Sequence, residues 1–149
     1  MAGKAERDTE TVDGVVRALY AAISFPDGGK PDWERESRIF PPEARMTRMS
    51  EEGMQTFTLA EYRANFERMQ AEGSMPGFHE LEIARKTLAY GDLVHVWSSY
   101  EAKRSPESAE VLFRGINSLQ IVRRSGRWQI LSAVWFREGR STPIPGEFL

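Results

Sequence analysis

The sequence contains no cysteine and only two histidines among its 149 residues. Without cysteine the chain can form no disulfide, and it has no thiolate nucleophile or Cys-based zinc or iron–sulfur site. His79 and His95 fall on different predicted strands, and no His–His or Glu–His pair has the spacing of helical metal ligands. We therefore expect no metal and no other cofactor, so that any chemistry is acid–base chemistry.

The chain also lacks a long apolar run and an excess of basic residues. Twenty Lys and Arg residues balance 22 Asp and Glu residues, which argues against nucleic-acid binding. No apolar run approaches the roughly 20 residues of a membrane span, and no apolar stretch follows the charged first residues, so we expect neither a membrane span nor a signal peptide. The sequence predicts a soluble, cytoplasmic protein with a single domain over residues 1–149, comprising a core at about 8–140 and loose ends.

Three helices are predicted in the first half of the chain. Apolar residues recur at helical spacing over 12–23, after Asp8 and Thr9, which we expect to cap this helix. Residues 31–40 suit a short second helix, with a proline at its start and two prolines behind it. The third helix is predicted to begin at Thr58-Leu59-Ala60-Glu61, which has the pattern of a capping box.

The periodicity changes from helical to alternating after Pro76-Gly77. Helices followed by long antiparallel strands predict an α+β fold, in which three N-terminal helices pack in a strongly curved mixed or antiparallel sheet. Such a sheet forms a cone with a central pocket. A weaker alternation at 44–49 suits a short early strand, followed by a turn at 50–53. The long strands are predicted at 78–88, 93–103, 110–123 and 127–137.

Three stretches of the sequence are similar to a known family. They begin with Asp32-Trp33-Glu34-Arg35, Ala89-Tyr90-Gly91-Asp92 and Arg114-Gly115-Ile116-Asn117. Together they resemble the nuclear transport factor 2-like (cystatin-like cone) superfamily and, within it, the bacterial polyketide-cyclase-like (SnoaL-like) or uncharacterised branch. The resemblance implies the cone fold and a homodimer. The superfamily includes isomerases, dehydratases, cyclases, epoxide hydrolases and transport factors, so the fold alone assigns no activity.

The candidate catalytic residues are His79, Asn117 and Tyr20. His79 alternates with Leu81 and Ile83; if this face lines the cone, its imidazole is a general acid or base, and otherwise it is a hydrogen-bonded residue near the mouth. Asn117 lies on an apolar strand face and needs a hydrogen-bond partner from a ligand or a neighbouring strand. Its position is similar to that of a substrate-orienting Asn in the dehydratases of the superfamily. Tyr20 either packs in the core or, as the resemblance to ketosteroid-isomerase-like members implies, stabilises an oxyanion.

Charged residues on the strands complete the candidate set. The alternation places Glu80 and Glu82 on the face opposite His79, so we expect no carboxylate to project into the cone. Arg85 and Arg114 interrupt apolar faces, and each either binds an anionic ligand or extends to solvent.

The last strand is apolar on both faces, which predicts a homodimer through the sheet face. We expect the protein to bind a small molecule that is apolar or weakly polar. The alternatives are a cofactor-independent isomerase, cyclase or lyase with His79 as general acid or base, and a non-catalytic dimeric interaction module. The aromatic residues expected to contact the ligand are Trp33, Tyr62, Phe66, Trp97, Phe113 and Trp135.

Overall fold

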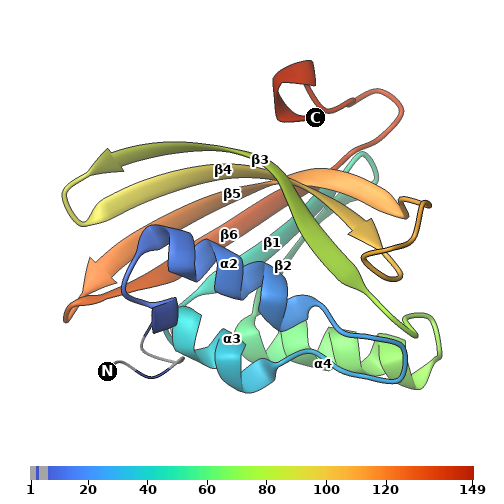
Figure 1. The fold of residues 1–149 in the computed structure, drawn as a ribbon, viewed down its shortest axis with the longest axis horizontal. Helices are drawn as coiled ribbons and strands as arrows, with labels where there is room; N and C mark the ends of the chain where they lie inside the picture. The colour runs from blue at the N-terminus through green and yellow to red at the C-terminus, as the bar shows by residue number, and fades with distance from the viewer. Residues whose placement is uncertain (1–2, 4–6) are drawn as a thin grey trace.

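The computed structural model describes residue 3 and residues 7–149, and in this part of the chain one six-stranded sheet curves over three α-helices (Figure 1). The expected α+β cone is confirmed. The N-terminus was predicted to be loose, and its residues 1–2 and 4–6 lie outside the described residues. The helices are α2 (Val12–Ile23), α3 (Trp33–Ile39) and α4 (Leu59–Ala71), and the strands are β1 (Arg45–Ser50), β2 (Gly53–Thr58), β3 (His79–Tyr90), β4 (Leu93–Lys103), β5 (Phe113–Arg124) and β6 (Arg127–Arg137).

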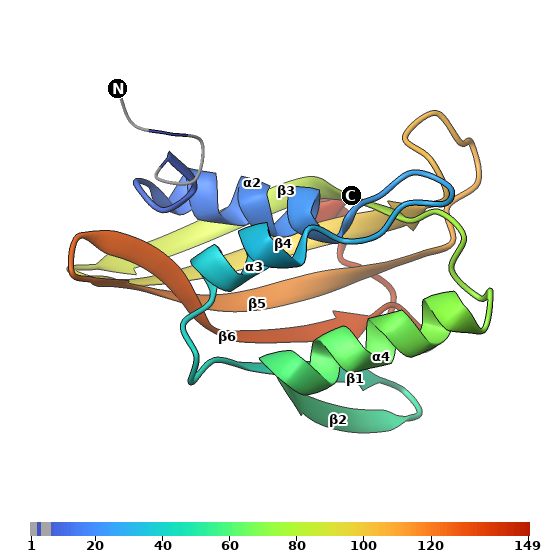
Figure 2. The same ribbon diagram turned by 90° about the horizontal axis from the view of Figure 1, so that it is seen from below.

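The strand order is β2-β1-β6-β5-β4-β3, and every neighbouring pair is antiparallel except β1 and β6, which are parallel. The sheet is therefore mixed, one of the two arrangements that the sequence left open. Strand β2 was not predicted. It is a short edge strand whose residues are mostly exposed, so it carries little of the apolar alternation that marks a strand in a sequence. Seen from the helix side, α2 lies along β3, and α4 lies along β1 and β2 (Figure 2).

The helix N-termini confirm one prediction and correct another. The capping box at Thr58–Glu61 is present, with hydrogen bonds of 3.2 and 3.1 Å. The prediction that Asp8 or Thr9 caps the first helix is wrong, because Thr11 is the cap of α2. The Asp8 carboxylate instead accepts two hydrogen bonds from the Arg35 guanidinium, at 2.9 and 3.0 Å, and so fastens the segment before α2 to α3.

The C-terminal segment, which we expected to be loose, packs on the face of the sheet away from the helices (Figure 1). Ile144 and Phe148 are buried, and the Phe148 carbonyl accepts a hydrogen bond of 2.7 Å from the Ser99 hydroxyl of β4. Apolar side chains around the β3–β4 hairpin stay exposed, among them Leu88 and Leu93. Homodimerisation through the sheet face stays a prediction.

Gly115 in β5 allows the Tyr100 ring of β4 to pack into the cone. A Cβ at position 115 would lie 2.7 Å from Tyr100 Cζ, 2.7 Å from the Phe136 carbonyl oxygen, and against the Tyr100 hydroxyl. In a strand, glycine at such a position permits a close approach that any side chain would prevent.

We predict that Gly115→Ala lowers the free energy of unfolding by about 1–3 kcal/mol, because the Tyr100 ring must move to admit the methyl group. Urea unfolding followed by circular dichroism measures the change. Gly146→Ala is the control, since its Cβ meets open space. Equal stability of the two variants would contradict the prediction.

Candidate functional site

A cavity of about 80 Å³ lies inside the cone, with walls from all six strands or their ends and from helices α2 and α4. Its wall is mainly aromatic and aliphatic, and it includes the flexible side chains of Met46, Met69 and Met75. An engineered protein cavity of about 150 Å³ binds benzene, so this cavity suits a smaller molecule, or a larger one if the methionines move. The polar side chains on the wall include Glu80, Asn117 and two arginines, Arg48 and Arg137.

The curvature of the sheet brings these polar groups together. Glu80 belongs to β3 and Arg137 to β6, which are separated by β5 and β4 in the strand order. In a flat sheet, two strands between them would hold these side chains well apart, about 14 Å by the usual strand spacing. Here both line the same cavity, and the Arg137 charge acts on the Glu80 carboxyl.

Glu80 is the acidic residue on the described cavity wall. Burial raises the pKa of its carboxyl to about 8, against the opposing effects of a hydrogen bond from Asn117 and the Arg137 charge. At neutral pH this carboxyl is therefore mostly protonated, and it exchanges its proton close to neutrality. The prediction that no carboxylate projects into the cone is wrong. The alternation correctly separates the two faces of β3. It does not show which face meets the helices, and in the structure this is the face that carries Glu80 and Glu82.

His79 lies away from the cavity. Together with Arg17, Ser24 and Leu81 it lines a separate hollow between α2 and β3, which Glu80 also borders. The structure therefore does not bring the His79 imidazole together with Asn117 on one wall.

A chain of hydrogen bonds joins the cavity to the α2 side of the sheet. The Asn117 amide donates to the Tyr20 hydroxyl at 2.9 Å, and the Ser98 hydroxyl donates to Glu82 at 2.5 Å. Since the Ser98 proton is used in this way, Tyr20 donates in the 2.7 Å bond between the two hydroxyls. Tyr20 therefore contacts Asn117 from the side away from the cavity, and its hydroxyl proton points to Ser98. Burial raises the pKa of the Tyr20 phenol above its usual value.

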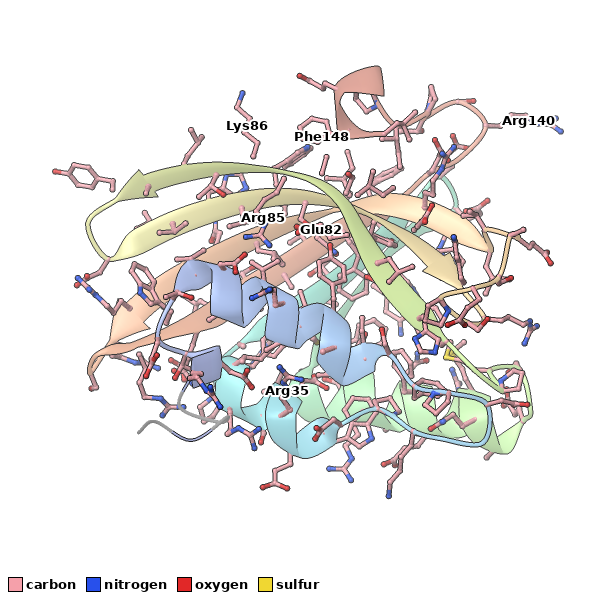
Figure 3. The ribbon with its side chains drawn as sticks, viewed as in Figure 1. Arg35, Glu82, Arg85, Lys86, Arg140 and Phe148 are labelled. Atoms are coloured by element: carbon pink, nitrogen blue, oxygen red, sulfur yellow. The ribbon has the colours of Figure 1, made fainter. Side chains whose placement is uncertain are left out.

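This chain of hydrogen bonds ends at a cluster of ion pairs. Arg85 donates to both Glu82 carboxylate oxygens, at 2.8 and 3.0 Å, and to Asp13 of α2 at 3.0 Å. Figure 3 shows Glu82 and Arg85 close together beneath the sheet, beside α2. A β-bulge between Glu82 and Ala84 keeps both charged side chains on the helix side, although three positions separate them.

The predicted aromatic residues divide between the wall and other places. Tyr62, Phe66, Phe113 and Trp135 line the cavity. Trp33 packs edge-on behind two of them, with ring centroids 6.4 Å from Tyr62 and 5.7 Å from Phe66.

Trp97 is not on the cavity wall but is 38% exposed, beside His95 on β4.

Sequence reasoning missed Glu80, Arg48 and Arg137 as site residues. Nothing in the sequence distinguishes Arg137 from the other arginines of the strands. For Glu80 a signal existed: the alternation places it on the strand face opposite His79, and this is the face that lines the cavity. The two arginines that had been singled out, Arg85 and Arg114, form ion pairs with Glu82 and Glu138 instead. No group of three or more His, Cys, Asp or Glu side chains in the described part of the chain is arranged to hold a metal ion, and none of its helices is long and apolar enough to cross a membrane.

Solved structures share this fold at low sequence identity. A cystatin-like protein of unknown function from Nostoc punctiforme matches with a TM-score of 0.61 and 14% identity, over 89% of this chain and 96% of that one. An NTF-2-like protein of unknown function from Silicibacter pomeroyi matches with a TM-score of 0.59 and 17% identity, over 85% and 92%. A putative ketosteroid isomerase from Parabacteroides distasonis matches with a TM-score of 0.61 and 11% identity, over 91% and 98%.

No family sequence model matches the chain, and no curated protein matches it in sequence. The solved structures confirm the nuclear transport factor 2-like, cystatin-like cone that the resemblance implied. They establish the fold and assign no activity, since such cones serve many functions.

The raised pKa of Glu80 predicts a specific pH dependence of stability. The folded protein holds this proton up to about pH 8, whereas the ordinary pKa is 4.5. The stabilisation is therefore complete below about pH 4.5 and is lost as the pH rises to about 8. We predict that wild type loses stability relative to Glu80→Gln between pH 5.5 and 8.5, measured by urea unfolding.

The comparison of wild type with Glu80→Gln separates Glu80 from the other acid whose pKa burial raises. Burial also raises the pKa of Glu36, to about 7, but Glu36 is present in both proteins and so cancels from the difference between them. Glu147→Gln, at an exposed position, is the control and should follow the wild-type profile. Parallel profiles of wild type and Glu80→Gln would contradict the prediction.

Proposed function

We propose that the protein binds a small molecule in the cone cavity, with an apolar body against the aromatic wall and one oxygen-bearing group at Glu80 and Asn117. The observation that carries the proposal is the carboxyl of Glu80 on a mainly apolar wall. Burying a carboxyl costs free energy that an apolar residue at the same position would not. A site for a polar ligand group accounts for this cost at Glu80.

The hydrogen-bonded neighbours support the same reading. A protonated Glu80 donates to a ligand carbonyl or hydroxyl oxygen, and the Asn117 amide beside it is held by Tyr20. Asn117 is buried and its orientation is set by this bond. The polar end of the cavity is therefore organised before a ligand enters, which lowers the entropy cost of binding.

We predict that 2-butanone binds in the cavity and that Ala133→Leu weakens this binding about tenfold or more, because the larger side chain fills the space. Ala133 is a buried residue of the wall. Two-dimensional amide NMR titration measures binding and also reports whether the variant is folded; Ala133→Val is the milder substitute.

Ala64→Leu, on the exposed side of α4, is the matched control and should bind like wild type. Shifts that are absent from wild type, or that persist unchanged in both Ala133 variants, would contradict binding in this cavity.

The second candidate function is proton transfer on a carbonyl compound, of the cofactor-independent isomerase kind. Its support is the pKa of Glu80, about 8, which lets one carboxyl both accept and return a proton near neutral pH. The carboxylate takes a proton from the carbon next to the ligand carbonyl, leaving an enolate, and the resulting carboxylic acid returns a proton to carbon. This role belongs to Glu80 rather than to His79, which borders the other hollow.

We predict that the protein catalyses exchange of the α-hydrogens of 2-butanone in deuterated water, with a rate that rises with pH through about 8. Proton NMR measures the exchange. Glu80→Gln should reduce the rate to the buffer background, and His79→Ala should leave it unchanged. Exchange that survives in Glu80→Gln and is lost in His79→Ala would reverse the assignment; binding without any exchange would leave the first function alone.

Two further proposals concern assembly and location. The exposed apolar residues around the β3–β4 hairpin support a homodimer through the sheet face, and the composition supports a cytoplasmic location. Failure of both the binding and the exchange experiments would favour the remaining alternative, an interaction module that uses this face.

A further inference from the structure

We infer that the ligand of the cavity is an anion, a short-chain carboxylate whose negative group binds the guanidinium of Arg137. The inference rests on the proposed small-molecule binding and narrows it to a chemical class. Two observations support it: the Nε of Arg137 has no hydrogen-bond partner among the described residues, and the cavity wall carries more positive than negative charge.

Arg137 is the cavity-wall arginine whose buried Nε has no hydrogen-bond partner among the described residues. Within those residues no carboxylate lies at ion-pair distance from it, in contrast to Arg85 with Glu82 and Arg114 with Glu138. Its guanidinium carbon lies 3.9 Å from the centroid of the Phe113 ring, a second wall residue, so the guanidinium is held against the aromatic wall. A buried donor that makes no bond costs free energy unless a ligand supplies the acceptor.

The charge on the wall points the same way. Arg48 is a second arginine of the cavity, with one amino group bonded to the Gln55 side chain at 3.0 Å. Glu80 is the acidic residue on the described wall, and it is mostly neutral at pH 7 for the reason given above. The cavity wall therefore carries positive charge that no carboxylate of the described residues pairs with, in a mainly apolar setting, and an anion relieves this better than a neutral molecule does.

The chemistry of the guanidinium selects the class of anion. Nε and one terminal nitrogen present two parallel N–H groups that match the two oxygens of a carboxylate. Phosphate has the same match, but the small cavity of about 80 Å³ with its apolar wall favours a carboxylate on a short hydrocarbon chain. The Glu80 and Asn117 pair then remains free for a second oxygen-bearing group of the same molecule.

The test compares two probes of nearly equal shape, butyrate and the neutral ketone 2-pentanone, by amide NMR titration of the full chain at pH 7 and constant ionic strength. We expect butyrate to bind about tenfold more tightly, the effect of a charge-assisted pair of hydrogen bonds. Arg137→Gln should remove this preference, so that the ratio of the two dissociation constants falls to about one. Arg137→Lys, which keeps the charge without the paired donors, should retain part of it.

Arg140→Gln is the matched control, because Arg140 is exposed three positions further along the chain and extends away from the fold (Figure 3). It should bind both probes like wild type. Binding of 2-pentanone with no preference for butyrate, or a preference that survives Arg137→Gln, would overturn the anion assignment and leave the proposed function standing. Binding of neither probe would overturn both.

Discussion

The two hydrogen bonds that join the Tyr20 hydroxyl to strands β4 and β5 are the interaction on which the cone depends. Tyr20 projects from α2, its hydroxyl accepts from Asn117 of β5, and it donates to Ser98 of β4. All three residues are buried, so each of these polar groups needs its partner inside the protein. The helix is thereby held at one depth and one rotation over the curved sheet, and the Asn117 amide is directed toward Glu80.

The polar end of the cavity is not built for stability alone. The hydrogen-bonded chain from Asn117 through Tyr20 and Ser98 to Glu82 is continuous. On the other side of Asn117, the cavity wall holds a mostly neutral Glu80 and an arginine whose Nε has no partner among the described residues. Apolar residues at those two positions would be the more stable choice. A buried carboxyl with a raised pKa beside an unpartnered arginine donor on one cavity wall is typical of sites that bind or react.

Much of the fold followed from local patterns. The capping box at Thr58–Glu61, the helix over 12–23 and the strands at 93–103 and 127–137 were recognisable because each depends on neighbours in the sequence. Strand β2 was not, since an exposed edge strand needs no apolar alternation. Of the site, Asn117 and four aromatic wall residues were anticipated, while Glu80 and Arg137 were not.

The sequence by itself determined the three helices, the long strands, their order and the absence of cysteine chemistry, because periodicity, caps and composition are local properties of the chain. Only the tertiary structure decided which face of β3 meets the helices. Alternation in β3 is equally compatible with either face inward, since the C-terminal segment packs on the outer side and gives apolar residues there a partner as well. Because of this choice, and because the curvature brings β3 and β6 around one cavity, the cavity is lined by Glu80 and Arg137 and not by His79.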